Sequence, residues 1–75
     1  MSSDILKGQW KQIKGSVQKN WGKLTNDEVD QIQGDSNKLI GKLQEKYGYT
    51  RSQAESEVNK FLNKHNFVDQ NAQNQ

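Results

Sequence analysis

The chain has 75 residues, a net charge of +2, no cysteine and no proline. Without cysteine it forms no disulfide and no thiolate site, and no stretch approaches the roughly 18 apolar residues that a membrane span needs. Five Leu, four Ile, four Val and two Phe are a small apolar share for a folded chain, but the low net charge and two Trp favour an ordered domain with a thin core.

The first predicted helix covers residues 4–21. Asp4 is its candidate N-cap, and Gly22 lies just past its end, where glycine commonly stops a helix. Apolar residues recur at intervals of three or four, which places them on one helical face. This face consists of Leu6, Trp10, Ile13, Val17 and Trp21.

A capping box opens the second predicted helix, over residues 26–33. The hydroxyl of Thr25 can accept a backbone N–H, and Glu28 can reach back to the backbone of the cap residue. Val29 and Ile32 face inward, and Gly34 ends the helix.

Two further helices are predicted, over residues 36–47 and 51–65. Gly48 stops the third helix, and the segment from Thr50 to Gln53 is a second capping box that opens the fourth. The inward stripes of these two helices are Leu39, Ile40, Leu43 and Tyr47, then Ala54, Val58, Phe61 and Leu62. Residues 67–75 are polar, and we expect a disordered C-terminal tail there.

The glycines indicate an internal repeat. Gly8, Gly15 and Gly22 are spaced by seven residues, and Gly34, Gly41 and Gly48 follow with the same spacing after an offset of 26. A simpler alternative is that each helix reuses glycine as its stop. We expect an all-α fold, with four helices arranged as two packed α-hairpins in a single domain over residues 1–66. The expected core is Trp10, Ile13, Val17, Trp21, Leu24, Leu39, Leu43, Tyr47, Val58, Phe61 and Leu62.

Two glycines need a separate explanation. Gly15 and Gly41 lie inside predicted helices, where each costs about 1 kcal/mol relative to alanine. Both lie away from the apolar stripe of their helix. Either another helix of the fold packs closely over them, or a partner's backbone or a phosphate approaches there, or they reflect sequence drift.

Few side chains could support catalysis or metal binding. His65 ends the last predicted helix, where the helix dipole favours it, and one histidine without cysteine makes no metal site. Asp27, Glu28 and Asp30 gather at a helix start, where acids are expected from the dipole, and they lack the spacing of a calcium loop. The glycines do not form a phosphate-binding loop. We therefore expect no enzyme, no metal and no cofactor.

Lysines are concentrated near the N-terminus. Residues 1–24 hold five Lys and one acidic residue, a net of +4. Lys7, Lys11 and Lys14 form a helical stripe that, with Lys23, could bind nucleic-acid phosphates without sequence preference. A second stripe is Lys38, Lys42 and Lys46. The alternative is that the lysine stems cover the edge of the core while their charges stay in water.

These motifs together resemble the CsbD-like family of small bacterial proteins. The resemblance covers about residues 4–62 and rests on Gly8-x-Trp10-Lys11-Gln12-x-Lys14-Gly15, Trp21-Gly22-Lys23-Leu24-Thr25-Asn26-Asp27, Gly34, Leu39-Ile40-Gly41-Lys42-Leu43-Gln44-Glu45, Tyr47-Gly48-Tyr49 and Ala54-Glu55-x-Glu57-Val58. It implies a small fold of two packed α-hairpins, an association with the general stress response, and no catalytic residue. Asp35-Ser36 stand where family members often have basic residues, which weakens a nucleic-acid interpretation.

Two hypotheses about function follow. The first is a non-catalytic interaction or protective module in the cytoplasm, monomeric, with an unknown protein partner and no membrane association. It is motivated by the polar composition and by the unexplained glycines. The alternative is weak, non-specific nucleic-acid binding through the lysine-rich first helix. The N-terminus, Met1-Ser2-Ser3-Asp4, has neither the basic region nor the apolar run of a secretory signal.

Overall fold

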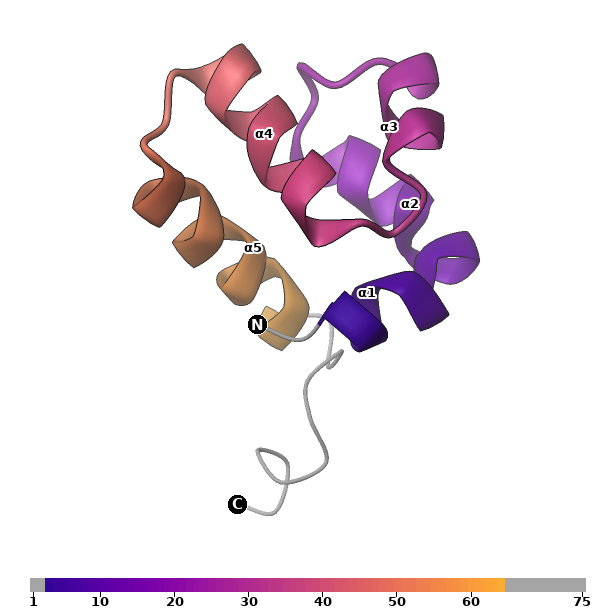
Figure 1. Ribbon diagram of the computed structural model, residues 1–75. Helices are drawn as coiled ribbons and strands as arrows, with labels where there is room; N and C mark the ends of the chain where they lie inside the picture. Colours follow the sequence, from indigo (N-terminus) through magenta and orange to yellow (C-terminus); the bar gives the residue numbers. More distant parts are fainter. Residues whose placement is uncertain (1–2, 65–75) are drawn as a thin grey trace.

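The computed structural model describes residues 3–64, and side chains from Leu6 onward. Within this range the chain forms helices and no strand (Figure 1), which confirms the all-α class. The helices are α1 (Ser3–Gly8), α2 (Trp10–Asn20), α3 (Asn26–Ile32), α4 (Ser36–Tyr47) and α5 (Arg51–Lys64). The expected bounds of α4 are confirmed, and those of α3 differ by one residue.

The expectation of four helices is wrong, because the first one is broken. Gln9 leaves helical geometry, with φ −105° and ψ 6°, and separates α1 from α2. Gly8, with its low helix propensity, ends α1 at this bend. The bend lets α1 contact α4 as well as α2, with Leu6 fully buried. Asp4 lies inside α1 rather than ahead of it, so it is not the N-cap.

The helices meet around α4. This helix lies beside α5 and also contacts α3 and α1, while α2 contacts α3 and α1 (Figure 1). The pairs α2–α3 and α4–α5 are each joined by a short loop, as the repeat suggests. However, α3 also packs on α4, so an arrangement as two separate packed hairpins is not confirmed.

Side-chain caps define three helix starts. Both predicted capping boxes are present: Thr25 Oγ1 accepts the N–H of Glu28 at 3.1 Å, and Thr50 Oγ1 accepts the N–H of Gln53 at 3.1 Å. In each box the longer side chain accepts the N–H of the threonine at 2.9 Å. Asp35 caps α4 by accepting two backbone N–H groups of its first turn, at 2.9 and 3.2 Å. The caps fix where α3, α4 and α5 begin.

The core follows the predicted apolar stripes, with one exception. Tyr47 is only partly buried and packs against the edge of the core. Within the core, the Trp21 and Phe61 rings pack against each other, with 5.0 Å between their centroids. The buried apolar side chains are Leu6, Trp10, Ile13, Val17, Trp21, Leu24, Val29, Ile32, Leu39, Ile40, Leu43, Ala54, Val58, Phe61 and Leu62.

The ends of the helices use glycine unequally. Gly48 caps α4 with φ +71°, and its N–H donates to Gln44 O, as predicted. Gly22 lies just past α2 but has no positive φ. At the end of α3 the left-handed conformation begins one residue early, since Gln33 has φ +51°.

At Gly34 the packing leaves no room for a side chain. Its φ is +79°, and a Cβ at this position would lie 2.6 Å from the Cα of Lys7 and 3.1 Å from the carbonyl oxygen of Leu6. Both atoms belong to the backbone of α1, so they cannot swing aside as a flexible side chain would. The α3–α4 turn therefore rests directly on α1, whereas the sequence indicated only a helix end here.

Three expectations lie outside the described residues: the position of His65 at the end of the last helix, the domain boundary at residue 66, and the tail over residues 67–75. No helix in residues 3–64 is long and apolar enough to cross a membrane.

We predict that Gly34→Ala destabilises the protein by roughly 2–4 kcal/mol, because alanine meets both an unfavourable φ and the α1 backbone. Gly15→Ala is the matched control. It lies in open space, so the higher helix propensity of alanine should stabilise the protein by about 0.5–1 kcal/mol. Urea unfolding followed by circular dichroism measures both changes. A Gly34→Ala variant as stable as the wild type would contradict the close approach.

Candidate functional site

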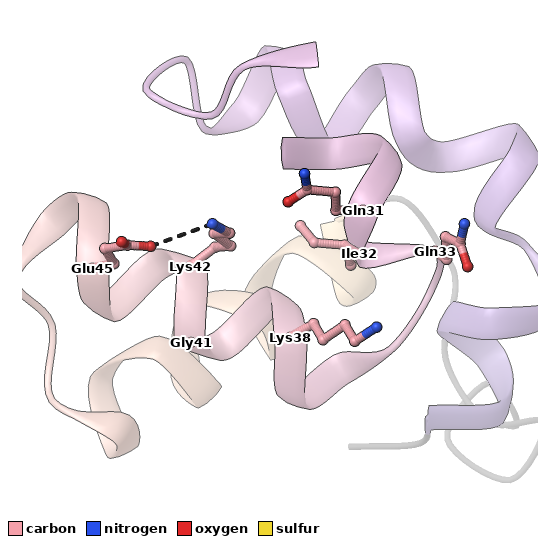
Figure 2. Close-up of a pocket in the computed structure, with 7 residues that line it drawn as sticks. All are labelled: Gln31, Ile32, Gln33, Lys38, Gly41, Lys42 and Glu45. Atoms are coloured by element: carbon pink, nitrogen blue, oxygen red, sulfur yellow. Dashed lines mark hydrogen bonds and ion pairs between the residues drawn. The ribbon is translucent and has the colours of Figure 1, made fainter. Parts of the chain in front are cut away.

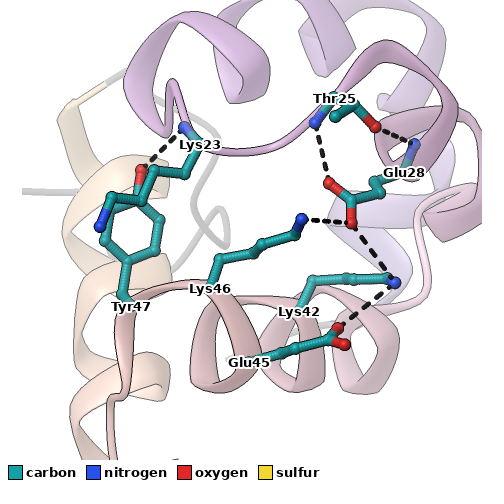
Figure 3. A network of polar contacts seen from close by, with 7 residues as sticks. All are labelled: Lys23, Thr25, Glu28, Lys42, Glu45, Lys46 and Tyr47. Carbon is teal, nitrogen blue, oxygen red and sulfur yellow. Dashed lines mark hydrogen bonds and ion pairs between the residues drawn. The ribbon is translucent and has the colours of Figure 1, made fainter.

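A polar network joins α3 to α4 (Figure 3). One carboxylate oxygen of Glu28 accepts the N–H of Thr25, and the other lies 2.8 Å from Lys46 Nζ and 3.7 Å from Lys42 Nζ. Lys42 Nζ is also 3.4 Å from a carboxylate oxygen of Glu45. The Glu28 side chain is 16% exposed and the two lysine side chains 28% and 30%. The second lysine stripe is thus largely committed to a carboxylate of the same chain.

The network shifts the pKa values of two of its members, Glu28 and Lys46. The hydrogen bond from Lys46, then the one from the Thr25 backbone, lowers the pKa of Glu28 from its ordinary 4.5 to about 2. The same hydrogen bond raises the pKa of Lys46 above its ordinary 10.5. Glu28 therefore stabilises the fold in full above about pH 4.5, and that contribution is lost as the pH falls towards 2.

Tyr47 ties the loop before α3 to the end of α4 (Figure 3). Its hydroxyl accepts the backbone N–H of Lys23 at 3.2 Å, and Lys23 Nζ lies 5.1 Å from the centre of its ring. The Tyr49 ring stacks on the Tyr47 ring at 5.4 Å, with 9° between the planes. Lys23, a predicted nucleic-acid contact, is placed by these contacts near Tyr47, away from the start of α2.

A shallow groove runs between α3 and α4 (Figure 2). Gly41 lies on its α4 side, and Ile32, which is almost completely buried, lies at its edge on α3. Amide and charged side chains surround the glycine. The lining residues are Gln31, Ile32, Gln33, Lys38, Gly41, Lys42 and Glu45.

The two unexplained glycines do not serve packing within the described chain. A Cβ at Gly15 or Gly41 would have no heavy atom of the described residues within 4 Å, and both residues are exposed. None of the helices in residues 3–64 therefore packs over them. The alternative, approach by a partner, stays a prediction. Each glycine lines a hollow of the surface, Gly41 in the groove and Gly15 on α2.

The predicted lysine contacts separate into two places. Lys7, Lys11 and Lys14 line one hollow, although the helix that was to carry them is broken at Gln9. Lys14 Nζ lies 3.6 Å from Asp30 Oδ1 in the same hollow. Lys23 does not line it.

Two acidic residues of α3 pair with lysines of different helices. Glu28 belongs to the capping box and the polar network, and Asp30 pairs with Lys14. No group of three or more His, Cys, Asp or Glu within the described residues could hold a metal ion. Sequence reasoning found the cap role of Glu28 but missed its partner Lys46, because that pairing depends on how α3 lies across α4.

Comparison with known proteins gives consistent matches. The model of the family described as CsbD-like matches residues 4–56. The chain is 46% identical over 67 residues to the UPF0337 protein YjbJ of Escherichia coli O6:H1, which covers 89% of this chain and 97% of that protein. It is 46% identical over 61 residues to the UPF0337 protein PA4738 of Pseudomonas aeruginosa, covering 81% and 94%. These names state no activity. No solved structure matches the chain significantly.

We predict that Glu28→Gln removes one pH-dependent component of stability. The wild type should lose its advantage over this variant as the pH falls from about 4.5 to about 2, because the carboxylate is then protonated. Thermal unfolding followed by circular dichroism between pH 2 and 7 measures the difference. Glu45→Gln is the control, since its 64% exposed side chain makes only a surface pair. A constant difference between wild type and Glu28→Gln across this range would refute the prediction.

Proposed function

The chain belongs to the CsbD-like family, and on that premise we propose that it is a non-catalytic interaction or protective module of the bacterial general stress response. We place it in the cytoplasm as a monomer that binds a protein partner. The stress association comes from the family resemblance. The interaction role is argued from the surface of this chain.

The observation that carries the proposal is the exposed glycine of the α3–α4 groove. Gly41 sits in the middle of a twelve-residue helix, where alanine would be more stable by about 1 kcal/mol. No described atom prevents a Cβ there. Because Gly41 lines the groove, we infer that a side chain there would occupy part of it. The glycine thus keeps the groove open at a cost in stability, as expected for a surface that another molecule approaches closely.

The surroundings of the groove favour a protein as that molecule. Lys38, Lys42 and Glu45 present charges of both signs, and Gln31 and Gln33 present amides that donate and accept hydrogen bonds. A rim that mixes charges of both signs with amides is typical of protein interfaces. Lys42 is held by Glu28 and Glu45, so part of the rim is already ordered before a partner arrives.

Nucleic-acid binding through the four N-terminal lysines has less support. Lys23 is separated from the other three, and Lys14 faces a carboxylate. On the second stripe, Lys42 and Lys46 are paired with Glu28. A duplex would therefore meet an interrupted line of positive charge, whereas non-specific binding depends on many simultaneous phosphate contacts.

We predict that Gly41→Gln makes the protein more stable but a poorer protector. The test is the heat-induced aggregation of citrate synthase, followed by light scattering, with and without the purified protein. The wild type should suppress aggregation, and Gly41→Gln should suppress it less because the new side chain occupies the groove. Urea unfolding should show a gain of about 0.5–1 kcal/mol for the same variant.

Gly15→Gln is the matched control, since it makes the same change at another exposed helical glycine. It should gain similar stability and keep full protection. If the wild type neither suppresses aggregation nor binds a protein partner, or if both variants protect as the wild type does, the proposed role of the groove is wrong.

A further inference from the structure

The hollow at the start of α2 gathers positive charge from two helices. Lys7 comes from α1, and Lys11 and Lys14 come from the first half of α2. All three lysines are exposed, and Gly8 and Trp10 line the hollow with them. Because the helix is interrupted at Gln9, Lys7 and Lys11 belong to separate helices yet line the same depression.

The fold fixes the position of Lys7. The backbone of α1 at this residue is in direct contact with Gly34, at a distance that leaves no room for a Cβ. The neighbouring Leu6 is fully buried. The backbone of Lys7 is therefore held in place by the turn between α3 and α4, and Lys7 lines the hollow from this fixed position.

Three lysines and one carboxylate of the described residues line the hollow, so its positive charge is only partly neutralised. Asp30 is the carboxylate that lines it, and it lies 3.6 Å from Lys14 Nζ. No salt bridge joins Lys7 or Lys11 to another of the described side chains. Lys42 and Lys46, in contrast, are both within 3.7 Å of Glu28. Like charges gathered in one place are unfavourable unless an anion neutralises them.

We propose that this hollow binds a small multivalent phosphate, with Lys7 and Lys11 as its main contacts and Lys14 as a shared one. A phosphate chain offers several charged oxygens to several ammonium groups at once. This inference does not depend on the α3–α4 groove, and it names a ligand class that the proposed interaction role does not.

The ligand is recognised by its phosphates alone. The hollow's aromatic residue, Trp10, is only 8% exposed and so offers little ring surface for a base to stack on. Tripolyphosphate and a nucleoside triphosphate should therefore bind with similar affinity. A duplex should bind more weakly at this site, since Asp30 and the displaced Lys23 interrupt the charge that it would need.

The test is an amide proton–nitrogen spectrum titrated with sodium tripolyphosphate at constant ionic strength, and in parallel with ATP and a mixed-sequence DNA duplex. Tripolyphosphate and ATP should shift the amides of residues 7–14 and of Gln33 and Gly34. The double variant Lys7→Gln/Lys11→Gln should weaken binding about tenfold or more. The charge-preserving Lys7→Arg/Lys11→Arg should retain it.

The control double variant is Lys19→Gln/Lys64→Gln, which removes the same charge from exposed lysines elsewhere. It should bind tripolyphosphate as the wild type does. Equal weakening in both double variants, or shifts spread over all lysines, would show attraction to net charge only and would overturn the site. A duplex that binds more tightly than tripolyphosphate and also shifts the amides near Lys23 would overturn the small-phosphate assignment in favour of nucleic acid. A dispersed spectrum for each free variant shows that it is folded.

Discussion

The direct contact between Gly34 and the backbone of α1 is the constraint on which the arrangement of this small domain depends. It brings the turn between α3 and α4 within van der Waals distance of Lys7. With α1 held there, Leu6 is fully buried and the chain bends at Gln9 to start α2. A domain with so few apolar residues has little core to spare, so the loss of one short helix would expose a large share of it. The contact also holds the backbone of Lys7, which lines a surface hollow together with Lys11.

Much of this fold can be predicted from local sequence patterns. The apolar stripes identify the inward faces, and the Thr-x-x-Glu and Thr-x-x-Gln boxes locate the starts of α3 and α5, because each depends on residues three or four apart. The internal repeat is also visible in the structure: α2 starts at Trp10, and α4 starts 26 residues later at Ser36. The break at Gln9 could not be predicted in this way. Leu6 continues the stripe of α2 in register, and the bend depends on the contact of α1 with α4 and Gly34 as well as on Gly8.

The glycines show why spacing alone does not assign a role. All six follow one pattern in the sequence, yet Gly34 is enclosed by backbone, Gly48 closes a helix in the left-handed conformation, and Gly15 and Gly41 face open space. The sequence singled out the last two correctly as unexplained, but it ascribed them first to packing inside the fold. Their surroundings depend on which helices lie nearby, and this is information about tertiary structure. The lysines are similar: Lys7 and Lys11 remain unpaired with described side chains, while Lys42 and Lys46 meet Glu28 across the α3–α4 contact.

Glu28 performs two tasks with one carboxylate, since one oxygen caps α3 and the other holds Lys46 of α4. The first turn of α3 therefore cannot fray without also releasing the attachment between the two helices. Fraying of this turn and loss of the contact between Glu28 and Lys46 are thereby coupled. A seven-residue helix, too short to persist alone in water, thereby acquires the lifetime of its contact with α4. Its amide protons should exchange with solvent together with those of the α3–α4 contact, as one cooperative unit rather than as a loose terminal turn.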